Sequence, residues 1–397
     1  SDEHRLFEKT LSIPFGMDPS PGLTARFQIA LDQATLSATF EGDQMVSTFG
    51  SYDLNLTVPG GVGVPSAGTT LVTVLPTHRR QGILRAHMRE HFQEAQAKGQ
   101  HLAALWASES CIYGRFGYGP AAERSSITIE KPYAKLQKSP KIQGTMRLVD
   151  EEEALKVFPP IYEGVATQRA GMFTRASDWW KVRNLADPED LRRGATSHRR
   201  VVHYRDGQPV GYSIYRTLTD YNAYTTELRI SELIAQDTEA EKALWEYLFG
   251  VDLVAKITHW NLPPHDPLFW WLERPRELDR HPSDSIWVRP LNVVEAFNRR
   301  HYPVDGRLVF RYQDELCPWN EGVYELQTSA DEPGDCRESS ASTELELTPF
   351  SLGAVYLGGH RVGALARAGL IQGSPEAIQR ADAMFRWHTE PWCQEIF

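Results

Sequence analysis

The order of the elements that the sequence predicts constrains this fold most, because one order occurs twice along the chain. The first copy has a hairpin at 38–57 that turns at Glu41-Gly42-Asp43, a β-branched strand at 70–75, a helix at 83–95 and an apolar strand at 102–107. Apolar residues recur at helical spacing only in the third of these elements. Hairpin, strand, helix and strand in this order predict a mixed α/β structure.

The second copy begins after a Lys-rich stretch at 131–145, where we place the first domain boundary. Its elements are a hairpin at 200–217 that turns at Asp206-Gly207, a strand at 228–235, a helix at 239–249 and a strand at 254–260. The two copies lie about 150 residues apart and share their topology but not their sequence. We therefore predict two domains of one topology, at 1–135 and 136–285.

A third domain, predicted at 286–397, has a different order of elements. Strands at 307–311, 323–327 and 343–347 precede helices at 349–357, 361–368 and 375–385, and a polar stretch at 331–342 predicts an exposed hairpin loop. The chain ends Pro391-Trp392-Cys393-Gln394-Glu395-Ile396-Phe397, which is apolar and aromatic. Because chain ends that fray are usually polar, we expect this tail to be docked on the protein.

Charge and cysteine content narrow the classes of function. The chain has 42 basic and 52 acidic residues, which give a formal net charge of −10. A surface that grips nucleic-acid phosphates carries a basic surplus, so we expect no nucleic acid and favour cationic small molecules as partners. The four cysteines lie far apart, no apolar run approaches about 18 residues and no signal peptide is visible. We therefore expect a reduced, cytoplasmic protein without a membrane span.

A basic loop separates the strand and the helix of the first copy. The sequence there is Val72-Thr73-Val74-Leu75-Pro76-Thr77-His78-Arg79-Arg80-Gln81-Gly82-Ile83-Leu84. A helix N-terminus presents free N–H groups and partial positive charge, so such a junction binds phosphates. The alternative is a surface turn with two solvated arginines. At the same position the second copy has Ala235-Gln236-Asp237-Thr238-Glu239, whose acidic residues would repel a pyrophosphate.

A second motif follows the neighbouring strand and carries a resemblance to a known family. It is Ala107-Ser108-Glu109-Ser110-Cys111-Ile112-Tyr113-Gly114-Arg115-Phe116-Gly117-Tyr118-Gly119. A tyrosine four residues before Gly-aromatic, together with R-R-x-G-x-L in the basic loop, resembles the GNAT acetyltransferase pattern. The segment 71–120 is similar to the enhanced intracellular survival (Eis) N-acetyltransferases, as are the strings at 56–60 and 356–361. The similarity continues in order from about residue 36 to Phe397.

This resemblance implies both the fold and the cofactor. It implies a tandem of GNAT folds, each with a mixed, splayed sheet, followed by a sterol-carrier-protein-like α+β domain. Acetyl-CoA would bind the first GNAT domain alone, since the second lacks the basic loop. The residues that would contact acetyl-CoA are Leu71, Val72 and Val74 on the strand, Arg79, Arg80, Gly82, Ile83 and Leu84 at the phosphates, and Ser108 on the next strand.

The resemblance also implies the catalytic groups. Tyr113 would be the general acid that protonates the CoA thiolate. The α-carboxylate of Phe397, at the chain's own end, would reach the active site and take a proton from the attacking amine. Its unperturbed pKa of about 3.3–3.7 means that burial would have to raise it or that water would relay the proton.

Departures from the family pattern fall on the substrate side. The acidic residue expected just before the terminal Phe is Ile396 here, and Glu395 comes one place earlier. Phe27 and Asp18 align with an aromatic and an acidic residue of the substrate cleft, and Trp106 stands where a His is expected. We therefore expect Asp18, Phe27, Trp106 and Glu395 to contact the acceptor.

The predicted function is acetyl-CoA-dependent N-acetylation of primary amines on polycationic acceptors such as aminoglycosides, polyamines or lysine-like side chains. Two alternatives stay open, namely a protein-lysine acetyltransferase and a non-catalytic protein that binds lipid or CoA. The resemblance implies a homo-hexamer. No metal is expected, because His87 and His91 of an H-x-x-E-H string lie among the apolar positions of their helix, which favours packing over zinc binding.

Overall fold

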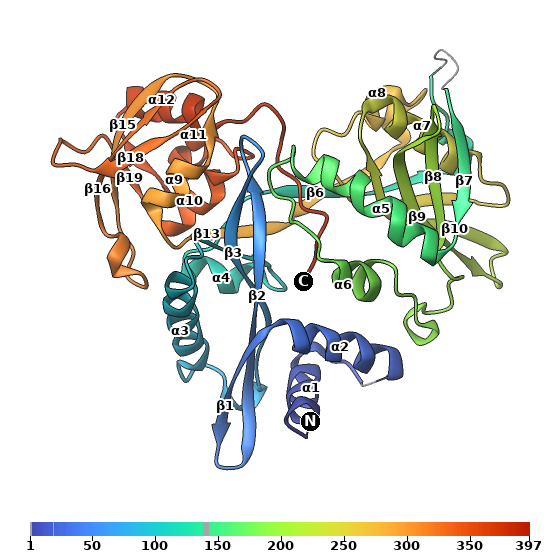
Figure 1. Ribbon diagram of the computed structural model, residues 1–397, viewed down its shortest axis with the longest axis horizontal. Coiled ribbons are helices and arrows are strands. Elements are labelled where there is room, and N and C mark those ends of the chain that lie inside the picture. The colour runs from blue at the N-terminus through green and yellow to red at the C-terminus, as the bar shows by residue number, and fades with distance from the viewer. Residues whose placement is uncertain (1, 19, 138–142) are drawn as a thin grey trace. The chain divides into compact units, whose positions relative to one another are not determined.

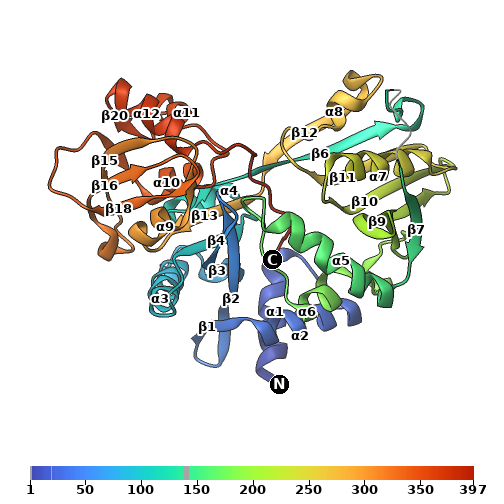
Figure 2. The same ribbon diagram turned by 45° about the horizontal axis from the view of Figure 1, so that its top comes forward.

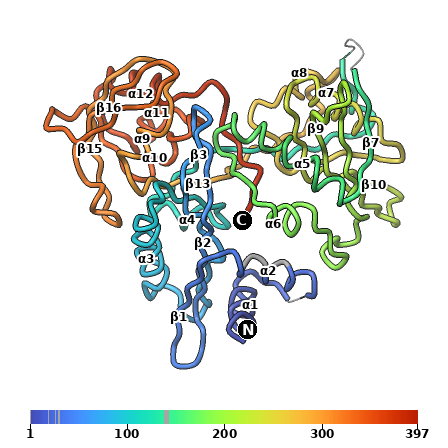
Figure 3. The backbone as a smooth tube through the Cα atoms, in the orientation of Figure 1, coloured from blue at the N-terminus to red at the C-terminus, as the bar shows by residue number. Residues whose placement is uncertain are grey.

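The structure is a computed structural model that describes residues 2–18, 20–137 and 143–397 (Figures 1 and 3). Lys138, Lys141 and the rest of 138–142, part of the predicted boundary stretch, lie outside the described residues. Contacts between residues divide the chain into two compact units. The first comprises Ser1–Glu123, Thr167–Thr174 and Asp284–Phe397, and the second comprises Arg124–Ala166 and Arg175–Ser283.

A six-stranded sheet of the first unit has the order β1-β2-β3-β4-β13-β5 (Figure 1). Its strands are β1 (Thr35–Glu41), β2 (Gln44–Val58), β3 (Val62–Val74), β4 (Leu102–Trp106), β5 (Gly119–Pro120) and β13 (Ile286–Pro290). β3 and β4 are parallel because helix α3 (Ile83–Ala97) returns the chain between them, whereas the other pairs are antiparallel. The first predicted copy of hairpin, strand, helix and strand is confirmed.

The second unit holds a seven-stranded sheet of order β12-β6-β11-β10-β9-β8-β7 (Figure 2). Its strands are β6 (Glu123–Glu130), β7 (Thr145–Val149), β8 (Arg199–Arg205), β9 (Gln208–Asp220), β10 (Thr225–Ala235), β11 (Lys256–Leu262) and β12 (Asp279–Asp284). Its helices are α5 (Glu151–Ala166), α6 (Ser177–Trp179), α7 (Thr238–Gly250) and α8 (Leu268–Trp271). The β8–β9 hairpin, β10, α7 and β11 repeat the order of the first unit, which confirms the predicted topological repeat.

Two strands are exchanged between these sheets. β6 follows the strands of the first sheet in the chain, yet it pairs antiparallel with β11 of the second sheet. β13 follows the strands of the second sheet, yet it lies between β4 and β5 of the first. The predicted domains at 1–135 and 286–397 contain β6 and β13, so strand pairing does not follow those limits. A local pattern predicts a strand but not its partner.

The C-terminal part of the first unit has a five-stranded sheet of order β18-β16-β15-β19-β20. The strands are β15 (Gly306–Tyr312), β16 (Gly322–Thr328), β18 (Asp335–Glu338), β19 (Leu345–Leu347) and β20 (Gln372–Gly373), and β14 (His301–Tyr302) pairs with β17 (Glu332–Pro333). The helices are α9 (Val293–Arg299), α10 (Pro349–Tyr356), α11 (Val362–Arg367) and α12 (Pro375–Phe385). Each strand and helix that the sequence predicts here is confirmed to within a few residues.

Several helices have no counterpart among the predicted elements. The longest of them are α1 (Asp2–Phe15), α2 (Pro21–Gln33) and α5. α5 contains Pro159 and Pro160, residues that usually break a helix, and it nevertheless buries Phe158, Ile161 and Tyr162. No helix in the described part of the chain has the length and apolar character needed to cross a membrane.

Candidate active site

The pairing between β3 and β4 ends early and leaves two strand edges facing each other. The parallel ladder covers only Ser66–Gly68 of β3 and Leu102–Ala104 of β4. β3 continues to Val74 and β4 to Trp106 without further pairing to each other. We call the point after Gly68 and Ala104 the fork. The predicted residues Leu71, Val72 and Val74 lie on β3 just beyond it.

A bulge in β3 accompanies the fork. The register with β2 shifts between Thr48 and Gly50, where β3 supplies one extra residue, and Leu71 adopts a left-handed backbone with φ +53°. The Thr48 hydroxyl donates to the Leu71 carbonyl at 2.8 Å, and the Ser47 hydroxyl donates to the Thr73 carbonyl at 2.7 Å. A leucine in this conformation costs about 1–3 kcal/mol, and such strain concentrates at functional sites.

The basic loop after β3 has the features of an anion site. Gly82 is the N-cap of α3 with φ +85°, a Cβ there would meet nothing within 4 Å, and the first turn at Ile83 and Leu84 holds no acidic residue. Arg79 and Arg80 are exposed, and within the described part of the chain neither guanidinium has a hydrogen-bond or ion-pair partner. Free N–H groups, open space and two uncompensated cations suit a pyrophosphate.

The corresponding helix of the second sheet begins differently. Asp237 is the N-cap of α7, and its carboxylate accepts from the Ala240 N–H at 2.9 Å. The same carboxylate forms an ion pair with Arg205. A carboxylate therefore already occupies this helix N-terminus, and binding of acetyl-CoA by the first domain alone stays a prediction.

Tyr113 ends the short helix α4 (Ser110–Tyr113), which follows β4. Its side chain is buried, and burial raises its pKa above the usual value, while a hydrogen bond with the Ser108 side chain acts in the opposite direction. Its phenol is therefore protonated at neutral pH, as a general acid requires. The Tyr113 ring meets the Tyr118 ring edge to face at 6.2 Å.

A buried chain of hydrogen bonds, which the sequence did not reveal, supports this pair of tyrosines. The Thr69 hydroxyl lies 2.8 Å from the Tyr118 hydroxyl and 2.8 Å from Nε2 of His91. Burial lowers the pKa of His91 to about 3, so the ring is neutral at physiological pH. His87 is also buried and hydrogen-bonded to hydroxyl groups, which confirms packing roles for both histidines. The described residues contain no cluster of three metal-ligating side chains.

A buried ion pair fixes the turn that follows Tyr113. Arg289 of β13 donates from Nε to the Phe116 carbonyl at 2.8 Å, and its two terminal nitrogens contact the Asp314 carboxylate at 3.0 and 2.6 Å. Both side chains are only 1% exposed. An arginine inside the apolar strand Ile286–Pro290 was the one sequence signal for this pair.

The last residue of the chain lies at the fork. A Cβ built on Gly68 would come within 3.2 Å of the Phe397 ring, and that ring meets those of Phe173 and Tyr52 at 5.3 and 6.3 Å. Trp392 and Cys393 are buried, so the predicted docking of the tail is confirmed. The chain therefore ends where β3 and β4 part.

The predicted acceptor residues differ in their surroundings. Trp106 is half-buried and packs on the same apolar cluster as Phe397, and Glu395 is buried. Phe27 is half-buried in α2, and Asp18 is exposed between α1 and α2. Contact of these four residues with an acceptor stays a prediction.

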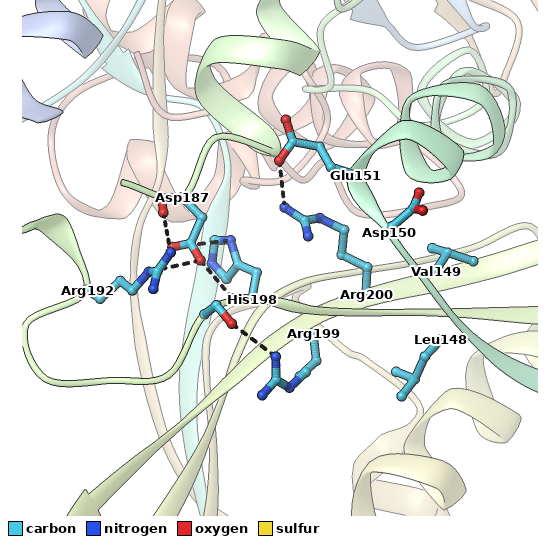
Figure 4. A pocket seen from close by; sticks show the side chains of 10 residues that line it. Leu148, Val149, Asp150, Glu151, Asp187, Arg192, His198, Arg199 and Arg200 are labelled. Atoms are coloured by element: carbon cyan, nitrogen blue, oxygen red, sulfur yellow. Dashed lines mark hydrogen bonds and ion pairs between the residues drawn. The ribbon is translucent and has the colours of Figure 1, made fainter. Parts of the chain in front are cut away.

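One cavity of about 400 Å³ lies in the second unit and contains none of the predicted residues (Figure 4). It is lined by Leu148, Val149, Asp150, Glu151, Asp187, Arg192, Ser197, His198, Arg199 and Arg200. Arg192 is paired with Asp187 at 3.2 Å, and Arg200 with Glu151 at 3.3 Å. In each of these ion pairs the two side chains neutralise each other's charge. The cavity is therefore a poor candidate for the active site.

Comparison with known proteins decides the family. Family models described as Acetyltransferase (GNAT) domain match residues 1–121 and 171–290, and one described as Sterol carrier protein domain matches 293–394. The N-acetyltransferase Eis of Mycobacterium tuberculosis is 34% identical over 87% of this chain and 84% of its own length. This chain belongs to the Eis family of GNAT N-acetyltransferases. It is therefore an acyltransferase, and its GNAT fold implies the use of acetyl-CoA.

Further relatives agree with this placement. An uncharacterized N-acetyltransferase of Streptomyces avermitilis is 34% identical over 90% of this chain and 88% of its own. The crystal structure of Eis1 from Mycobacterium abscessus superposes with a TM-score of 0.86 at 29% identity and covers 100% of this chain and 98% of that one. The predicted fold class, two GNAT domains followed by a sterol-carrier-like domain, is confirmed.

Replacing both loop arginines, Arg79→Ala with Arg80→Ala, should raise KM for acetyl-CoA by roughly 10–100-fold, because a hydrogen bond to a charged group contributes about 1.5–3 kcal/mol. The change in kcat should be smaller. Steady-state kinetics at two salt concentrations measures both constants. Arg89→Ala, an exposed arginine further along α3, is the matched control and should leave KM unchanged. An unchanged KM in the double variant would remove the loop from the acetyl-CoA site.

Asp314→Asn should lower the free energy of unfolding of the first unit by about 3–5 kcal/mol, because it leaves the Arg289 charge buried without a counter-charge. Urea unfolding followed by tryptophan fluorescence measures this. Glu315→Gln is the control, since Glu315 pairs with Arg85 at the surface and such a pair contributes about 0–1 kcal/mol. Equal stability of the two variants would show that the buried pair is not a structural anchor.

Proposed function

We propose that this Eis-family enzyme transfers the acetyl group of acetyl-CoA to primary amines of polycationic acceptors, such as aminoglycosides, polyamines or lysine side chains. The observation that carries the proposal is the position of Phe397 at the fork between β3 and β4. A chain end there brings a carboxylate to the strands on which the family binds its acyl donor. Tyr113 follows the second of these strands.

The acetyl-CoA site would be formed by the basic loop and by β3. The positive charge and the open space at the loop suit the CoA phosphates. Arg79, Arg80 and the N–H groups after Gly82, at Ile83 and Leu84, would hold the phosphates. Leu71, Val72 and Val74 of the bulged strand would contact the pantetheine, and Ser108 would lie beside it. Backbone N–H groups near Val74 would polarise the thioester carbonyl.

The proposed reaction is a direct transfer without an acyl-enzyme. The amine nitrogen forms a bond to the thioester carbon, and the bond from that carbon to sulfur breaks. The Phe397 carboxylate accepts the proton that the amine loses, directly or through water. The Tyr113 phenol donates its proton to the departing thiolate, and its raised pKa keeps that proton available at neutral pH. The products are an amide and free CoA.

The preference for cationic acceptors rests on charge. The chain carries an acidic surplus, with a net charge of −10, and it places Glu395 next to the chain end. Asp18, Phe27, Trp106 and Glu395 are the proposed acceptor contacts. A hexameric assembly and a cytoplasmic location belong to the same proposal, the first by family resemblance and the second from the four cysteines that lie far apart in the sequence.

Tyr113→Phe should lower kcat by roughly 10²–10⁴-fold, since it removes the proton of the general acid, and should leave KM for acetyl-CoA within about twofold. Thiol release from acetyl-CoA with a panel of aminoglycosides, polyamines and lysine peptides measures the effect. Tyr221→Phe, at an 80% exposed position, is the control and should keep full turnover.

The same panel separates the alternatives. Release with lysine peptides alone would support a protein acetyltransferase. No release with any amine would support a non-catalytic binder. Unchanged kcat in Tyr113→Phe would assign the acid to another group.

A further inference from the structure

A short segment between α5 and α6 belongs to the first unit, although both of its neighbours in the chain belong to the second. We call this segment, Thr167–Thr174, the strap. One side of the strap pairs with β2: the Thr57 N–H donates to the Met172 carbonyl and the Gly171 N–H to the Thr57 carbonyl, both at 2.8 Å. The strap is therefore attached to the sheet that carries the fork.

The other side of the strap holds the C-terminal tail (Figure 3). The Trp392 N–H donates to the Ala170 carbonyl at 2.9 Å, and the Arg169 guanidinium lies 5.5 Å from the Trp392 ring centre. Further along, the Phe173 ring stands perpendicular to the Phe397 ring at 5.3 Å. The strap thus contacts the tail at Trp392 and at its last residue, Phe397.

The tail has no helix or strand of its own. After α12 ends at Phe385, residues 386–397 form neither, so their position depends on contacts with other segments. Four residues lie between Trp392 and Phe397, and a chain spans at most about 3.3–3.6 Å per residue. Fixing both points leaves the terminal carboxylate little freedom to move.

Gly171 has no room for a side chain against the tail. Its backbone is left-handed, with φ +96°, and a Cβ there would lie 2.8 Å from the Trp392 carbonyl oxygen and 3.1 Å from the Trp392 carbonyl carbon and nitrogen. These are backbone atoms, which cannot rotate away as a flexible side chain would. Any side chain at 171 therefore requires the backbone of the strap or of the tail to shift.

We propose that the strap is the positioning element for the terminal carboxylate of Phe397, and that Gly171 and Phe173 set where that carboxylate lies. This rests on the proposed role of the carboxylate as base. A segment that lies in the chain between two helices of the second unit thereby controls the chemistry of the first. The strap residues act through Phe397 and need not touch the substrate.

Gly171→Ala tests this directly. We expect kcat to fall by roughly 100-fold, as for a catalytic group misplaced by about 1 Å, with KM for acetyl-CoA within about twofold. Gly369→Ala is the matched control, because Gly369 has φ +75° and a Cβ there would meet nothing within 4 Å. It carries the same left-handed penalty without touching the tail and should keep wild-type kcat.

Deleting Phe397 in both backgrounds separates positioning from general destabilisation. If the strap acts through the carboxylate, Gly171→Ala should add less than about threefold to the loss already caused by the deletion, because groups that act as one unit are not additive. Multiplied losses would overturn the proposal. Should Gly171→Ala fail to fold, Phe173→Leu removes the ring contact while keeping an apolar side chain, and should show the same non-additivity.

The outcomes also distinguish the two proposals. If deletion of Phe397 leaves turnover intact, the base lies elsewhere and the proposed mechanism fails. If the deletion lowers kcat but folded Gly171→Ala and Phe173→Leu both keep wild-type kcat, the carboxylate is the base and the strap does not position it.

Discussion

The end of the β3–β4 ladder after three residue pairs is the constraint on which the site depends. Parallel strands that stay paired satisfy each other's backbone groups and leave no edge for a ligand. Here the bulge at Leu71 shifts the register of β3, and two hydroxyls of β2 donate to the carbonyls of Leu71 and Thr73. Beyond the fork, the edge of β3 that faces β4 is unpaired with that strand. The basic loop and α3 follow β3 directly in the chain. The proposed acetyl-CoA site thus depends on a local end of strand pairing.

Segments from distant parts of the chain converge on this fork. In the chain, β13 follows all strands of the second sheet, and it contains Arg289. The ion pair of Arg289 with Asp314 and its hydrogen bond to the Phe116 carbonyl fix the turn after Tyr113. The strap lies in the chain between two helices of the second unit, and it contacts the tail. The second sheet repeats the topology, but Asp237 fills the helix N-terminus where phosphates would bind. The first unit therefore contains segments that precede and follow most of the second sheet in the chain.

Local patterns in the sequence predict most of the helices and strands and both motifs of the candidate site. Strand alternation, helical spacing and turn residues located most elements, and the basic loop and Tyr113 motif carried the family resemblance. Helix α5 was missed because Pro159-Pro160 conceals its apolar spacing. The exchange of β6 and β13, the Arg289–Asp314 pair and the strap depend on partners far away in the chain, which no local pattern specifies. Thr69 is one of several hydroxyl-bearing residues in its strand, and nothing in the sequence marks it as a hydrogen-bond partner of Tyr118 and His91.

In the proposed mechanism the chain's own terminal carboxylate serves as the base. Replacing the terminal carboxylate with a carboxamide by ligating a synthetic tail removes the base while keeping the Phe397 ring on the strap. Single-turnover acetylation should then slow by roughly 10²–10⁴-fold with acetyl-CoA affinity unchanged. Wild-type acetylation by the amidated protein would show that the terminal carboxylate is not the base.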